Sequence, residues 1–189
     1  MRFSHVYVED KARSFPLTEE ILNRCKDAVV IPIEHYKDVF DRPRQDIKAQ
    51  KRNPALILAV REGARIFKGA PVCQSFGQRN FYYSSCVMNC LFDCEYCYLR
   101  GMYPSSNIAL FVNFEDYEKD VVSYLEEGPL YICASYDTDL IALDGITGLA
   151  TKWIDLAKNN KDLLVELRTK SAPPVLENVP NVIYAFTVS

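Results

Sequence analysis

The chain has 189 residues, of which 49% are hydrophobic, and its formal net charge is −3. This length suffices for one sizeable core, or for one domain preceded by a smaller region. The sequence has no run of about 18 apolar residues, so we expect no membrane span. It also lacks the apolar segment of a secretory signal at its start. We therefore expect a cytoplasmic protein, in which the seven cysteines are free or metal-bound rather than paired.

The charge is divided unevenly along the chain. Residues 1–80 carry 15 Lys and Arg against 10 Asp and Glu, whereas residues 81–189 carry 7 against 15. Five of the basic residues lie in RPRQDIKAQKR, residues 42–52: Arg42, Arg44, Lys48, Lys51 and Arg52. A basic first half suits a polyanion such as DNA, and a solvated surface of mixed charge is the alternative.

Residues 1–77 are expected to form a mixed α/β region. The segment 17–30 predicts a short helix entered through Thr18, with Glu19 and Glu20 in its first turn. Residues 53–63 predict a strand that ends at a turn.

From Phe81 onward, predicted strands and helices alternate. Strands are predicted over 81–86, 130–136, 162–170 and 181–189, and helices over 114–128 and 145–160. This alternation is typical of a parallel βα architecture. A chain that ends at its fourth strand would leave a bare sheet edge. We therefore expect the first part of a longer protein, and a partner that covers the edge is the alternative.

A cysteine-rich loop, NCLFDCEYCYLRGMY, lies between the first predicted strand and the helix that follows it. Cys90, Cys94 and Cys97 have the spacing C-x3-C-x2-C. Thiolates are ligands for iron–sulfur clusters and zinc. A four-iron cluster normally takes four cysteines, so three would leave one iron open to a small molecule.

Two other interpretations of the loop remain open. Cys86 could act as a fourth ligand and close a zinc or cluster site, or the thiols could bind nothing. Structural zinc usually takes two separated ligand pairs, and the two histidines, His5 and His35, lie far from the loop in sequence.

The motif, placed after a first strand and with an aromatic residue before its last cysteine, resembles the radical S-adenosylmethionine superfamily. The resemblance implies a [4Fe-4S] cluster on Cys90, Cys94 and Cys97, with S-adenosyl-L-methionine on the open iron as the source of a 5′-deoxyadenosyl radical. It also implies an α/β fold. Residues 78–189 would form the first half of a partial (β/α) barrel, and residues 1–77 would precede it.

A closer resemblance covers essentially the whole chain. The sequence is similar to the spore photoproduct lyase family at four places: Tyr96-Cys97-Tyr98-Leu99, Val112-Asn113, DTDLIALDGIT (137–147) and LRTKSAPP (167–174). It spans about the first half of the family's usual length. The resemblance implies repair of spore photoproduct, a methylene-bridged thymine dimer in UV-damaged DNA, with an electron donor such as flavodoxin or ferredoxin.

The resemblance also implies roles for single residues. Tyr96 and Tyr98 match tyrosines that relay an electron and a hydrogen, although they could simply pack beside the cofactor. Lys170 matches the lysine for the methionine carboxylate, and Thr138 matches a hydroxyl near the cofactor. Thr187 and Ser189, at the end of the fourth strand, are expected to act in the same way.

The hydrogen donor departs from the family pattern. Tyr136 stands where the best-known members carry a donor cysteine. Cys133, three residues earlier, is expected on the opposite face of the strand, as a core residue. We therefore hypothesise that Cys73, in GAPVCQSFG, donates the hydrogen, with Tyr136 as the rival. Cys25 is expected in the core.

Two alternatives to a repair lyase remain. The first keeps the radical chemistry and changes the substrate. The second is a non-catalytic metal- or cluster-binding module.

Overall fold

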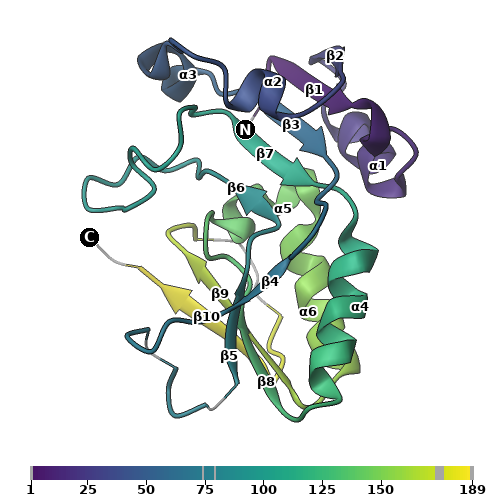
Figure 1. Ribbon diagram of the computed structural model, residues 1–189, viewed down its shortest axis with the longest axis vertical. Coiled ribbons are helices and arrows are strands. Elements are labelled where there is room, and N and C mark those ends of the chain that lie inside the picture. Colours follow the sequence, from purple (N-terminus) through teal and green to yellow (C-terminus); the bar gives the residue numbers. More distant parts are fainter. Residues whose placement is uncertain (1, 74, 79, 173–176, 188–189) are drawn as a thin grey trace. The chain divides into compact units, whose positions relative to one another are not determined.

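The computed structural model describes residues 2–73, 75–78, 80–172 and 177–187 (Figure 1). The chain forms two compact units, one of Met1–Arg61 with Val87–Asn113 and the other of Glu62–Cys86 with Phe114–Ser189. The expected boundary between residues 77 and 78 falls inside the second unit. There strand β4 (Ile66–Lys68) pairs antiparallel with β5 (Phe81–Ser84).

The first unit is built on a five-stranded sheet in the order β2-β1-β3-β7-β6. Its strands are β1 (His5–Glu9), β2 (Val29–Ile33), β3 (Leu56–Ala59), β6 (Val87–Met88) and β7 (Ile108–Phe111). All neighbours are parallel except β6 and β7. Strand β7, whose four residues are all buried, was not predicted from the sequence. Its continuous apolar run is typical of a strand buried on both faces.

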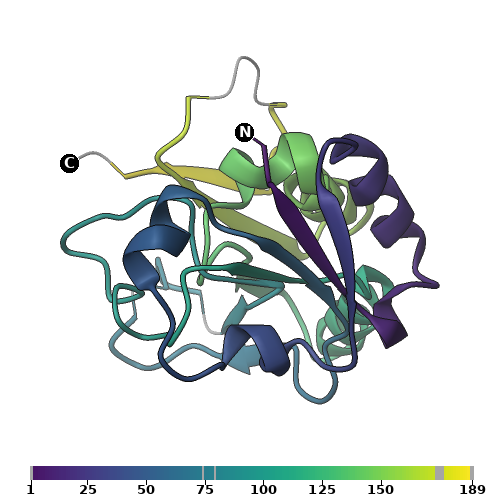
Figure 2. The same cartoon turned by 90° about the horizontal axis from the view of Figure 1, so that it is seen from above.

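The helices of the first unit are short. They are the 3-10 turn η1 (Asp10–Ala12), α1 (Pro16–Arg24), α2 (Lys37–Phe40) and α3 (Ile47–Arg52). The predicted first helix is confirmed in part as α1, which lies beside β1 and β2 (Figure 2), but the predicted segment 17–30 extends too far, since β2 already begins at Val29. Its entry through Thr18 is wrong. Phe15 is the N-cap and Pro16 opens the helix, since proline has the helical φ and needs no N–H partner there.

The second unit confirms the predicted βα alternation. Its sheet has the order β10-β9-β8-β5-β4, with β8 (Leu130–Cys133), β9 (Leu163–Thr169) and β10 (Val182–Phe186) parallel to β5. The helices are α4 (Phe114–Leu125), α5 (Leu140–Thr147) and α6 (Leu149–Asn159). The helix predicted over 145–160 corresponds to α6 and the last three residues of α5, and Gly148, with a left-handed φ of 67°, separates the two helices.

The two faces of this second sheet differ. Helices α5 and α6 pack against β9, and Leu163, Val165 and Leu167 are buried on that face (Figure 1). The opposite face carries a smaller cluster of Phe81, Tyr131 and Cys133. Over the described residues, no helix combines the length and apolar character needed to cross a membrane.

Candidate functional site

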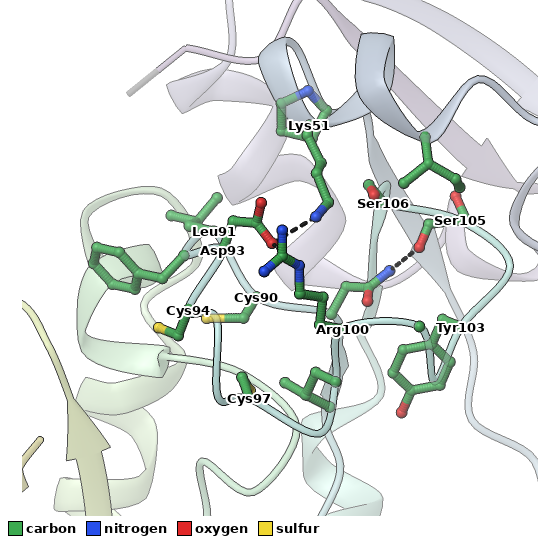
Figure 3. A pocket seen from close by; sticks show the side chains of 16 residues that line it. Lys51, Cys90, Leu91, Asp93, Cys94, Cys97, Arg100, Tyr103, Ser105 and Ser106 are labelled. Atoms are coloured by element: carbon green, nitrogen blue, oxygen red, sulfur yellow. Dashed lines mark hydrogen bonds and ion pairs between the residues drawn. The ribbon is translucent and has the colours of Figure 1, made fainter. Parts of the chain in front are cut away.

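The cysteine loop of the first unit connects β6 to β7. Cys90, Cys94 and Cys97 are half-buried, free of disulfides, and line one cavity of about 280 Å³ (Figure 3). Asn89, at the start of the loop, has a φ of 71°. Its side-chain amide donates to the carbonyl oxygens of Ser105 and Asn107, both at 2.8 Å. The two ends of the loop are thereby held together.

The thiols of this loop suit an iron–sulfur cluster by their chemistry. Three cysteines without disulfide bonds, all from one segment, line a shared cavity, and cysteine thiolates are the ligands that such clusters take. However, within the described part of the chain, no three His, Cys, Asp or Glu side chains lie close enough together to hold a single metal ion. The donor set therefore fits the cluster in composition and in the cavity that it shares.

Asp93 ties the loop to helix α3. Its Oδ1 accepts from Lys51 Nζ at 2.5 Å and pairs with Arg100 Nε at 3.4 Å (Figure 3). The hydrogen bond from Lys51 holds the pKa of Asp93 below its usual range. Lys51 was expected to meet DNA phosphates, but its ammonium group is engaged with the loop. The other basic residues of segment 42–52 are exposed: Arg42, Arg44, Lys48 and Arg52.

Tyr96 and Tyr98 lie in the same loop. Both side chains are more than half exposed. Neither packs in the core, so both phenols are accessible to a bound group, and their relay role stays a prediction.

In the second unit, polar groups gather at the carboxyl ends of β8 and β9. The Asp139 carboxylate caps α5 by accepting from the Ala142 N–H at 2.9 Å. It also accepts from the Thr169 hydroxyl at 2.9 Å and from the Lys170 N–H at 2.8 Å. This carboxylate fixes the end of β9 to the start of α5.

The predicted cofactor residues lie at this same edge. The Thr138 hydroxyl is buried and has no hydrogen-bond partner within the described residues. A buried polar group without a partner costs free energy, so Thr138 suits a ligand that supplies the missing bond. Lys170 Nζ donates to the Thr187 carbonyl at 3.4 Å. Ser189 lies outside the described residues.

Cys73 and Tyr136 pack together on the cluster of Phe81, Tyr131 and Cys133. The Tyr136 ring stacks on Tyr83, with centroids 4.2 Å apart. Burial raises the pKa of Tyr136, and the neighbouring Cys73 adds to that rise. Both candidate hydrogen donors therefore share one face of the sheet.

The expectation that Cys133 faces away from Tyr136 is wrong. Both lie in this one cluster. Strand β8 ends at Cys133, and Ser135 forms an antiparallel bridge with Ser85, so the alternation does not continue to Tyr136. Cys133 is fully buried, which confirms that it is a core residue.

Solved structures of spore photoproduct lyase are similar to this chain in fold. One, complexed with dinucleoside spore photoproduct, has 22% identity and a TM-score of 0.73 over 89% of this chain and 50% of its own. A double mutant with bound AdoMet and dinucleoside spore photoproduct has 21% identity and a TM-score of 0.78 over 98% and 56%. This chain has the fold of spore photoproduct lyase. No protein-family model and no curated protein matches it.

The likeness to spore photoproduct lyase confirms the expected fold class, an α/β fold that forms the first half of a partial (β/α) barrel. The chain spans about half the length of the spore photoproduct lyase structures that it matches.

The environment of Cys86 argues against a fourth thiolate ligand. Cys86 is only 1% exposed. Burial raises the pKa of its thiol to about 12. Because a metal binds the thiolate rather than the thiol, this environment favours a site of three cysteines.

Sequence reasoning missed a polar network on the face that carries Cys73 and Tyr136. The buried Glu166 carboxylate accepts from the Tyr131 hydroxyl at Oε2 and from Arg168 Nε at Oε1. The Cys133 thiol lies 3.6 Å from Oε1, and burial raises its pKa to about 12. Burial and the Glu166 hydrogen bond also raise the pKa of Tyr131. One sequence signal was available, since charged residues alternate with valine and leucine along 165–168.

Proposed function

We propose that this chain is the first part of a radical S-adenosylmethionine lyase that reverses spore photoproduct in UV-damaged DNA to two thymines. The observation that supports this most is the cysteine triad. Cys90, Cys94 and Cys97 line one cavity of a chain that has the fold of spore photoproduct lyase.

In this proposal the three thiolates hold a [4Fe-4S] cluster and leave one iron for S-adenosyl-L-methionine. When bound, these groups would supply the 5′-deoxyadenosyl radical that takes hydrogen from the lesion. Lys170 would pair with the methionine carboxylate of the cofactor. Thr138 would give its unpartnered hydroxyl to the same ligand, and Ser189 would add a further contact.

Cys73 is the proposed hydrogen donor to the thymine radical, because an S–H bond is weak. The S–H bond breaks, a C–H bond forms on the thymine, and a thiyl radical remains on Cys73. The adjacent Tyr136 phenol then restores the thiol by giving up its O–H hydrogen and becoming a phenoxyl radical. Tyr96 and Tyr98 would return this radical to the cofactor. Tyr136 is also the rival direct donor.

The remaining expectations concern partners. Arg42, Arg44, Lys48 and Arg52 are exposed, so they suit DNA phosphates through counterion release. A reduced flavodoxin or ferredoxin would supply the electron, and the location would be cytoplasmic.

The first experiment is EPR spectroscopy of the anaerobically reconstituted, reduced protein with and without S-adenosyl-L-methionine. We expect a four-iron signal that changes when the cofactor is added, also in Cys86→Ala but not in Cys97→Ala. Zinc in place of iron, or equal loss of the signal in both variants, would contradict the proposal. Repair of a dinucleotide lesion then separates this substrate from others.

Cys73→Ala tests the hydrogen donor. We expect this variant to consume the lesion but to release mainly side-trapped thymine adducts, whereas Cys25→Ala releases thymine. Clean thymine from Cys73→Ala would rule out this role and favour Tyr136.

A further inference from the structure

A charged residue is buried on the sheet face opposite helices α5 and α6. The Glu166 side chain is 1% exposed, next to the apolar cluster of Phe81 and Tyr131. Removing a carboxylate from water is expensive, and packed apolar side chains are often at least as stabilising as a buried ion pair. Stability alone therefore does not explain why this charge is buried.

Three donors surround the Glu166 carboxylate. The Tyr131 hydroxyl donates to Oε2, and Arg168 Nε donates to Oε1. The Cys133 thiol lies 3.6 Å from the same Oε1. Glu166 lies directly across from Cys133 in the pairing of β8 with β9. The carboxylate is thus held from two strands, in one orientation.

This arrangement holds the guanidinium group of Arg168 in one orientation. Arg168 uses its Nε on Glu166, but its side chain is still 47% exposed. For its two terminal nitrogens no partner is recorded among the residues that the structure describes. The residue paired with Arg168 on β10 is Ala185, whose side chain is a single methyl group. Arg168 also lies near the carboxyl end of β9, where barrels of this kind bind their ligands.

We propose that Arg168 binds the phosphodiester that joins the two thymidines of the lesion, and that Glu166 and Tyr131 are its positioning residues. This inference rests on the proposed function. A planar guanidinium offers two parallel N–H donors, which match two oxygens of one phosphate. The other anion at hand, the methionine carboxylate of the cofactor, is assigned to Lys170.

The test compares two ligands that differ by this one phosphate, dinucleoside and dinucleotide spore photoproduct. Binding to the whole chain is measured by calorimetry without turnover. Loss of a charged hydrogen bond predicts that wild type binds the dinucleotide roughly tenfold to a hundredfold more tightly. Arg168→Gln should bind both ligands equally. Lys161→Gln, which removes an exposed positive charge from the same unit, should keep the wild-type preference.

Two further variants test orientation. Arg168→Lys keeps the positive charge but removes the two parallel N–H donors of the guanidinium. Glu166→Gln keeps Arg168 but weakens the hydrogen bond that orients it. Both should reduce the preference for the dinucleotide without abolishing it, while the affinity for the dinucleoside is unchanged. A purely structural role would weaken both ligands alike, and that result would overturn the assignment.

A titration with dimethyl phosphate separates this inference from the proposed function. We expect it to shift the Nε–H NMR signal of Arg168 in the wild type. A shift without any lesion binding would support the anion site and refute the lesion as substrate. Three results would overturn the inference. The first is the absence of a shift, and the second is a preference for the dinucleotide that persists in Arg168→Gln. The third is an Arg168→Gln variant that loses only its binding of S-adenosyl-L-methionine.

Discussion

Raising the pH should destabilise this protein through its buried thiols. Burial raises the pKa of Cys86 and of Cys133 from 9.0 to about 12. At pH 10 about nine-tenths of each thiol is ionised in the unfolded chain, whereas both stay protonated in the folded one. Because the folded pKa is the higher one, the stabilisation is complete below pH 9 and is lost progressively as the pH rises towards 12.

The expected loss between pH 8 and pH 10 is between about 1 and 2 kcal/mol for each thiol, or roughly 3 kcal/mol for both. The assay is urea unfolding under reducing conditions at a series of pH values. Replacing one thiol should remove the part of the pH-dependent loss in unfolding free energy that this thiol contributes. Cys133→Ala should therefore lose less stability than wild type between pH 8 and pH 10. The difference corresponds to roughly half a molar in the urea midpoint.

Val165→Ala is the matched control, because it also removes a buried side chain but carries no titratable group. It should be less stable at every pH, with the same pH dependence as wild type. If Cys133→Ala also kept the wild-type pH dependence, the reasoning about its buried thiol would be refuted.

Three further substitutions test how the site is held. Asp93→Asn removes both ion pairs of the cysteine loop and should change stability by less than about 1 kcal/mol, since exposed pairs contribute little. It should nevertheless accelerate proteolysis within the loop, and an unchanged cleavage rate would contradict the anchoring role. Gly69→Ala would place its methyl group on the Phe81 ring and should cost about 1–3 kcal/mol in urea unfolding. Combining it with Phe81→Leu should recover part of this cost, and an equally unstable double variant would argue against the clash. Asp139→Ala removes the α5 cap and the bonds to β9, so we expect a loss of about 2–4 kcal/mol, seen as a melting temperature lower by roughly 5–15 °C. A shift below 2 °C would contradict that role.

Local patterns predicted those parts of the protein that depend on near neighbours in sequence. The spacing of Cys90, Cys94 and Cys97 brings three thiols to one loop in any fold, and they do line one cavity. The alternation of apolar runs and amphipathic segments after Phe81 predicted β5, α4, β8, α6, β9 and β10 to within a few residues at most of their ends, although α5 was missed. Thr138 and Lys170 were placed at strand ends by the same reasoning.

Other features depend on pairing between distant segments. Strand β7 joins the first unit through parallel pairing with β3, some 50 residues earlier in the chain. No local period encodes such a partner, so residues 1–77 were wrongly expected to stand apart from the segment that follows the cysteine loop. For the same reason, strand alternation was extended beyond the end of β8 and misplaced Cys133 relative to Tyr136.

The sequence by itself determined that three thiols lie in one loop and which class of fold the chain adopts, because cysteine spacing and hydrophobic period act over a few residues. Only the tertiary structure decided which groups meet on the open face of the second sheet. Tyr131 and Glu166 are 35 residues apart and lie on adjacent parallel strands. Their contact depends on the register between those strands, which the packing of the whole sheet sets and which no short segment specifies.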